Sequence, residues 1–144
     1  MNSVLFHLAF PVSDIEKTKD YYSKGLGCEV GRQTHHAVIL NLYDNQLVAH
    51  VTNEPLKPQK GIYPRHFGLI FTIESDWENL LERVRQKQLN FYQSPKVRFP
   101  GQITEHRTFF LQDPFYNLME FKFYRHLEAI FGSCDVKAIG DAVE

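Results

Sequence analysis

The sequence predicts a single α+β domain built from two copies of a strand–helix–three-strand unit. The chain has 144 residues, 43% of them hydrophobic and 23% charged, which is typical of one globular domain with its own core. Two strand-like segments carry a histidine near their start, and His7 and His66 are 59 residues apart. A helix-start pattern follows each segment, at 13–16 and at 75–78. This matched spacing indicates an internal duplication.

The first copy opens with an alternating strand at 4–12. Phe6, Leu8 and Phe10 fall on one face, which we expect in the core, and His7 and Ala9 fall on the other. A capping box at Ser13–Glu16 begins a helix that ends near Gly25–Gly27. Three strands are then expected at 28–33, 37–43 and 46–52, the last two joined by a tight turn.

The second copy repeats this order. A strand at 66–73 precedes a capping box at Ser75–Glu78 and an amphipathic helix marked by Trp77, Leu80, Leu81 and Val84. Strands are expected at 91–93, 107–112 and 117–124. The domain therefore spans 1–124, with module one at about 4–54, a linker at 55–63 and module two at about 64–124. The extension at 125–144 is expected to hold a short helix at 127–131 and a frayed end at 138–144.

Composition narrows the class of partner. The chain has 16 Lys and Arg against 17 Asp and Glu, with no run of five like charges, which argues against nucleic acid and membrane surfaces as partners. We expect no signal peptide, because 1–12 lack its pattern; no apolar run approaches about 18 residues, and Cys28 and Cys134 are far apart without metal-ligand spacing. We expect a cytoplasmic protein with a small-molecule substrate.

Three residues are candidate metal ligands. His7 and His66 start equivalent strands, and Glu120 interrupts an otherwise apolar strand. A buried carboxylate needs a charged partner, and two imidazoles with one carboxylate leave open positions on a divalent metal. The alternative for each histidine is a hydrogen-bonded packing residue. Recurrence at equivalent points of a duplication favours the metal.

The motifs FHLAFPV, DYYSKGLGCEVG, RHFGLIF and FFLQDPFYNLMEFK appear in this order between Leu5 and Tyr124. In this order they resemble the vicinal oxygen chelate superfamily, which includes glyoxalases, extradiol dioxygenases, fosfomycin-resistance transferases, epimerases and bleomycin-resistance proteins. The resemblance implies two βαβββ modules that form a half-barrel cup around a divalent metal, with His7, His66 and Glu120 as its ligands. One departure is Tyr116, where glycine is usual.

The type of reaction depends on whether a fourth ligand is present, as in glyoxalase-type members. Glu120 lies three residues after Asn117, and the same offset from Asn45 falls on Val48, which cannot bind a metal. A three-ligand set resembles that of extradiol dioxygenases, with Fe(II) or Mn(II) favoured; Zn(II) or Ni(II) would suit a glyoxalase-type site. The glyoxalase interpretation survives if Gln46 or His50 reaches the metal.

Further residues are candidates for catalysis and substrate binding. His50 is a candidate acid–base group because the pKa of an ordinary histidine suits proton transfer near neutrality. The tyrosine that extradiol enzymes carry about ten residues before the metal glutamate is replaced by Phe110. The segment 98–108 can bind an anion or form a lid: its candidates are the catalytic residue His106 and the substrate-binding residues Arg98, Glu105, Arg107 and Thr108, alongside Gln46.

Three functions follow from these observations. The first is a metal-dependent enzyme, most like a dioxygenase acting on a small oxygenated molecule. The second is a glyoxalase-type lyase or isomerase with a redox-inert metal. The third is a non-catalytic drug-binding protein like the bleomycin-resistance proteins, against which the metal triad counts. Dimers are common in proteins that this chain resembles, so we expect a homodimer.

Overall fold

The computed structural model describes residues 3–143 and contains two four-stranded sheets. The first half consists of β1 (His7–Val12), α1 (Ile15–Lys19), the π-helical segment η1 (Asp20–Gly25), β2 (Glu29–Gln33), β3 (Ala37–Leu42) and β4 (Asn45–Val51). The second half consists of β5 (Phe67–Phe71), α2 (Glu74–Gln86), β6 (Phe91–Arg98), β7 (His106–Gln112) and β8 (Leu118–Tyr124). The 3₁₀ helix η2 (Leu127–Ile130) and the strands β9 (Ala138–Ile139) and β10 (Ala142–Val143) follow.

The two sheets share one topology. Their strand orders are β1-β4-β3-β2 and β5-β8-β7-β6, and in each the first strand pairs in parallel with the last while the other neighbours are antiparallel. The predicted α+β fold of two βαβββ modules is confirmed. The register also shows which positions correspond: Ala9 lies opposite Val48 in module one, as Gly68 lies opposite Glu120 in module two.

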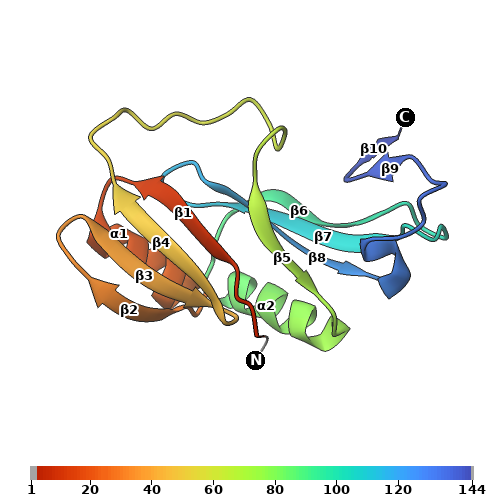
Figure 1. The fold of residues 1–144 in the computed structure, drawn as a ribbon, viewed down its shortest axis with the longest axis horizontal. Coiled ribbons are helices and arrows are strands. Elements are labelled where there is room, and N and C mark those ends of the chain that lie inside the picture. The colour runs from red at the N-terminus through yellow and green to blue at the C-terminus, as the bar shows by residue number, and fades with distance from the viewer. Residues whose placement is uncertain (1–2, 144) are drawn as a thin grey trace.

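The modules meet where β1 lies beside β5. The rings of Phe10 and Phe67 have centroids 5.7 Å apart, and the Asn117 side chain donates to the Pro11 carbonyl at 2.9 Å. Figure 1 shows these two strands running in opposite directions. Equivalent ends of the two modules therefore point away from each other along this seam.

The helices α1 and α2 cover one face of the sheets, and the linker and the C-terminal hairpin lie on the other side (Figure 1). The core forms under the helices, with Trp77, Tyr22, Phe109 and Phe121 among its fully buried side chains. In β1, Phe10 and Val12 are buried whereas His7 is exposed, as the alternation predicts. The face away from the helices is the one available for a functional site.

Local details differ from the expectations. The first helix is capped by Asp14, whose carboxylate accepts from the Lys17 amide at 2.8 Å, and not by Ser13. The second begins at Glu74 with Ile73 as its N-cap, so Ser75 lies inside the helix and caps nothing. Both expected capping boxes are therefore wrong. Aspartate competes with serine for the cap position, and pattern alone did not separate them.

The C-terminal extension is more ordered than expected. The short helix predicted at 127–131 is present as η2. The expected frayed end is wrong for its described part, because β9 and β10 pair as an antiparallel hairpin; Glu144 lies outside the described residues. The strand expected at 91–93 is also longer, since β6 continues to Arg98. In the described part of the chain, no helix has the length and apolar character needed to cross a membrane.

Candidate metal centre

Two of the three predicted ligands lie in contact. His66 immediately precedes β5, and its Nε2 is 3.1 Å from Glu120 Oε1 on the neighbouring strand β8. Gly68 allows the two strands to approach so closely, because a Cβ atom at this position would overlap the backbone of Glu120. The glycine on β5 thus lets the histidine before β5 and the carboxylate on the adjacent strand β8 lie side by side.

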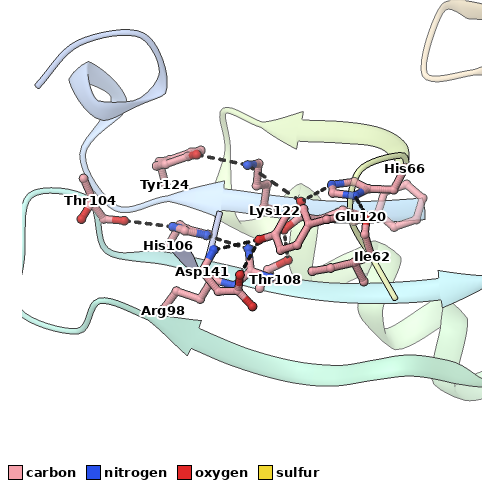
Figure 2. A network of polar contacts seen from close by, with 12 residues as sticks. Ile62, His66, Arg98, Thr104, His106, Thr108, Glu120, Lys122, Tyr124 and Asp141 are labelled. Atoms are coloured by element: carbon pink, nitrogen blue, oxygen red, sulfur yellow. Dashed lines mark hydrogen bonds and ion pairs between the residues drawn. The ribbon is translucent and has the colours of Figure 1, made fainter. Parts of the chain in front are cut away.

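Glu120 is held by a network of donors (Figure 2). Its side chain is 5% exposed, and its Oε2 accepts from Thr108 Oγ1 at 2.6 Å and from Arg98 Nη1 at 3.1 Å. Lys122 Nζ lies 3.9 Å from Oε1. Burial alone would raise the pKa of Glu120, but the hydrogen bond from His66 together with Lys122, Thr108 and Arg98 lowers it to about 2. The carboxylate is therefore ionised at neutral pH.

The ring of His66 is oriented by its second nitrogen. Nδ1 is 2.7 Å from the Ile62 carbonyl oxygen, which can only accept, so Nδ1 carries a proton. A neutral His66 then directs the lone pair of Nε2 at Glu120 Oε1, and two acceptors at this distance require a proton or a cation between them. The hydrogen bond to Glu120 raises the pKa of His66 against the opposing effect of burial. This donor set suits a divalent metal.

His7 shows the same arrangement on the other module. Its Nδ1 is 2.7 Å from Gln46 Oε1, so the amide oxygen accepts from the ring and leaves Nε2 free. The side chain is exposed at the start of β1. Gln46, expected to bind substrate, here orients a histidine.

The structure does not bring His7 to the other two ligands. Within residues 3–143, no group of three or more His, Cys, Asp or Glu side chains is placed to hold a metal. The antiparallel seam explains this, because His7 and His66 start strands that run in opposite directions (Figure 1). The expected triad is therefore divided, with two ligands on module two and one on module one.

The two candidate catalytic histidines differ in environment. His50 is exposed on β4, where it shares a face with Gln46 and lies opposite Pro11. His106 is buried: its Nδ1 donates to the Thr104 carbonyl at 2.9 Å, and its Nε2 lies 3.4 Å from Arg98 Nη1. Burial lowers the pKa of His106. A neutral His106 can accept from Arg98 and so hold the guanidinium in place.

The expected anion clamp is only partly assembled. Arg98 lies beside Glu120, whereas Arg107 points to the helix-covered side, where it stacks 4.2 Å over the Trp77 ring and pairs with Glu74 at 3.1 Å. Glu105 accepts from the Gly101 amide at 2.6 Å. Strand alternation separates the two arginines. Arg98 is paired with His106 in the sheet, and Arg107 is the next residue after His106 on β7, so its side chain points to the opposite face.

Two groups near the site make contacts that the sequence did not predict. Lys122 follows Glu120 by two residues, so strand alternation places both on one face and could have identified it. Tyr63 contacts Asp141 of the C-terminal hairpin through its hydroxyl. These residues are 78 apart in sequence, and no local pattern connects them.

Comparisons with known proteins agree with this fold. The family model for the Glyoxalase/Bleomycin resistance protein/Dioxygenase superfamily matches residues 4–121. A glyoxalase/bleomycin resistance protein/dioxygenase from Alicyclobacillus acidocaldarius is 36% identical, over 90% of this chain and 97% of that chain, with a TM-score of 0.85. No match was found among curated proteins.

More distant solved structures share the fold. The fosfomycin resistance protein FosX from Listeria monocytogenes is 16% identical, over 90% of this chain and 99% of that chain, with a TM-score of 0.67. A lactoylglutathione lyase from Agrobacterium tumefaciens is 15% identical, over 91% and 98%, with a TM-score of 0.64. Identities at this level show the fold alone.

Proposed function

The chain belongs to the Glyoxalase/Bleomycin resistance protein/Dioxygenase superfamily, and from this premise we propose that it is an enzyme that binds a small oxygenated molecule to a divalent metal. Two neighbouring oxygen atoms of the substrate would bind the metal together. The observation that carries the proposal is the contact of His66 and Glu120, in which Nε2 and a carboxylate oxygen lie 3.1 Å apart. A divalent cation bound by both atoms would take the place of the proton in this hydrogen bond.

His7 of a second copy of the chain completes the ligand set in this proposal. His7 and His66 each give their Nδ1 proton to an oxygen acceptor and keep Nε2 free, which is the orientation that metal-binding histidines adopt. His7 cannot serve the pair on its own chain because the seam directs it away. A two-fold dimer that places module one against module two of the other copy would bring the three together.

The surrounding residues prepare this site. Thr108 and Arg98 occupy Glu120 Oε2, which leaves Oε1 for the metal. When bound, the metal supplies a Lewis acid that stabilises negative charge on the substrate oxygens. His50 shares a face of module one with His7, so in such a dimer it would enter the site from the same copy and can carry a proton. His106 positions Arg98 and does not itself reach the metal.

We place a dioxygenase first among the reactions. Two imidazoles and one carboxylate with open positions are typical of Fe(II) and Mn(II) sites that bind a diol and dioxygen. Val48 stands at the position equivalent to Glu120, which supports a three-ligand set without a fourth protein ligand from β4. A protein of the same fold supports manganese, because a mutant of FosX from Listeria monocytogenes was crystallised with Mn(II) and a dihydroxypropylphosphonic acid. Zn(II) or Ni(II) would accompany the lyase alternative.

Metal binding by mixed dimers tests the proposal. His7→Ala and Glu120→Gln chains should each bind no Mn(II), measured by electron paramagnetic resonance titration. Co-expressed together, they form mixed dimers in which one site keeps all three ligands, so about a quarter of the wild-type capacity should return with random pairing. No recovery would place the ligands within one chain, and metal binding by either variant alone would contradict the ligand set.

Oxygen uptake separates the reactions. The wild-type protein loaded with Fe(II) or Mn(II) should consume dioxygen with a catechol or another vicinal diol, measured with an oxygen electrode. Turnover with Ni(II) or Zn(II) and no oxygen uptake would instead support the lyase. A protein that binds no metal at micromolar concentration would support the drug-binding alternative.

A further inference from the structure

We propose that Arg98 is a subsite for an oxyanion of the substrate, a carboxylate, phosphate or phosphonate group, and that the C-terminal hairpin closes this subsite. This inference rests on the proposed function, because it names the class of substrate that the proposed enzyme would bind. The hairpin is the segment 138–143, formed by β9 and β10. Two observations carry the inference: Arg98 has unused hydrogen-bond donors, and a carboxylate of the hairpin lies next to them.

Arg98 is buried with part of its hydrogen-bonding capacity unused. The residue is 5% exposed, and its Nη1 is bound to Glu120 and His106. Its Nε and Nη2 are buried and have no partner among the residues that the structure describes. Together these two nitrogens carry three N–H donors. Buried donors of a charged group without an acceptor are costly, and a functional role in binding an anion accounts for such a cost.

The unused donors have the geometry of an oxyanion receptor. Nε and Nη2 form one edge of the planar guanidinium, and their parallel N–H bonds match the two oxygens of a carboxylate or phosphate. The other side of the group is fixed by Glu120 and His106, so the fork is already oriented. Because Glu120 touches His66 with one oxygen and Arg98 with the other, the subsite lies one carboxylate away from the proposed metal.

The hairpin brings its own carboxylate to this place. Figure 2 shows Asp141 beside Arg98 and His106. A hydrogen bond from Tyr63, and in addition the charge of Arg98, lower the pKa of the Asp141 carboxyl. Arg98 and Asp141 nevertheless form no ion pair within 4.0 Å in the described structure. Asp141 thus lies near the fork without using it.

Tyr63 holds the hairpin through two hydrogen bonds to Asp141. The Tyr63 hydroxyl donates to Asp141 Oδ1 and accepts from the Asp141 amide at 3.1 Å. Gly140 has a φ of 64° and lies against the same hydroxyl, where a Cβ would overlap it. Ile139 is largely exposed, and two-stranded hairpins are marginally stable alone. This hairpin can therefore open when the Tyr63 contact breaks, which gives an anion access to Arg98.

The experiment measures binding of inorganic phosphate and of acetate to the metal-free full-length protein by isothermal titration calorimetry. Arg98→Lys keeps the charge but loses the fork and should weaken binding at least about tenfold. Arg85→Gln removes a charge from the exposed side of α2 and should change affinity less than about twofold. Thr108→Val removes a Glu120 partner but no Arg98 donor; because both residues donate to Glu120 Oε2, it can perturb binding indirectly, but by less than Arg98→Lys.

The hairpin is tested in the same assay. Tyr63→Phe removes both hydrogen bonds and should strengthen phosphate binding by about fivefold, with faster hydrogen exchange of the amides in 138–143. Asp141→Asn removes the competing charge and should act in the same direction. An unchanged affinity in both variants would overturn the role of the hairpin.

The outcomes separate this inference from the proposed function. Equal losses of phosphate binding in the Arg98 and Arg85 variants, a Thr108→Val effect as large as that of Arg98→Lys, or no binding even in Tyr63→Phe would overturn the subsite. Mn(II) binding by wild-type protein is measured independently of phosphate. A protein that binds Mn(II) but not phosphate would support the proposed function and contradict the subsite. A protein that binds phosphate but not Mn(II) would support the subsite and contradict the proposed function.

Discussion

The sheet of module one and the sheet of module two have one topology but different open faces. On module two, Glu120 collects donors from His66, Thr108 and Arg98, and most of this network is buried. On module one, the equivalent position is Val48, and His7 makes one hydrogen bond on that face, to Gln46. The scaffold is therefore repeated while the chemistry is not.

This difference teaches how a duplicated fold divides its tasks. The buried faces of both modules keep apolar side chains at matching positions, such as Val12 and Phe71. The open faces are less constrained, because neither α1 nor α2 packs against them. Module two carries charged side chains there, and module one presents a mostly apolar surface with two histidines, His7 and His50.

The largest loss of stability is expected from removing the carboxylate of Glu120, which distinguishes the open face of module two from that of module one. Glu120→Gln leaves Arg98 buried without its carboxylate, and breaking a buried ion pair in this way costs about 3 kcal/mol or more of unfolding free energy. Val48→Ala at the equivalent position should cost about 1 kcal/mol, since it removes only half-buried apolar atoms. Urea denaturation monitored by circular dichroism measures both. Equal losses would contradict the comparison.

A pH titration should show the same asymmetry. The folded-state pKa of Glu120 is lowered to about 2 from 4.5, so its contribution of about 3 kcal/mol is present above pH 4.5 and is lost as the pH falls toward 2. The raised pKa of His66 has the opposite sign, so its contribution is present below pH 6.5 and is lost as the pH rises through the raised value. Unfolding free energies of metal-free protein across pH 2–9 measure both. In the Glu120→Gln variant, the unfolding free energy should vary less with pH in both the acidic range and the range of the His66 titration.

Gly68 provides a third and smaller test. Gly68→Ala introduces a methyl group against the Glu120 backbone, and overpacking of this kind costs about 1–3 kcal/mol. It should also move Glu120 away from His66 and weaken Mn(II) binding. Ala9 already carries a side chain at the equivalent position of module one, so Ala9→Gly should cost about 1 kcal/mol or less and leave the Mn(II) affinity within about twofold. Normal metal binding by Gly68→Ala would refute the positioning role.

The smallest effect on stability is expected at His7. The side chain is exposed and makes one hydrogen bond, so His7→Ala should change the unfolding free energy by less than about 0.5 kcal/mol. Metal affinity should nevertheless be lost. A thermal melt alongside a Mn(II) titration distinguishes this from a core role, for which both quantities would fall together.

Periodicity and repetition predicted most of the architecture. The alternation of Phe10 and His7 in β1 and the recurrence of histidine at His66 identified both modules and the face of each strand, because burial of one face imposes a period of two. The offset that equates Val48 with Glu120 agrees with the observed register. The helix starts were less predictable, since Asp14 and Ser13 are both good caps.

The remaining parts of the site depend on contacts that no local pattern contains. The sequence predicted that His7, His66 and Glu120 belong together, but the direction of β1 relative to β5 keeps His7 away from the other two within the chain. The separation of Arg98 from Arg107 follows from strand phase, which required the exact start of β7 at His106. The hairpin at Asp141 meets Tyr63 only because the linker and the chain end lie on the same side of the sheets.

The antiparallel seam between β1 and β5 has a consequence for the history of the molecule. Equivalent strands that meet in opposite directions are related as the two halves of an isologous dimer are. A half-length ancestor of one βαβββ unit could have formed the Phe10–Phe67 contact between two separate subunits. The stretch 52–66, which contains no helix or strand, connects the two units, so a contact that two such subunits would bury between them is interior to one chain.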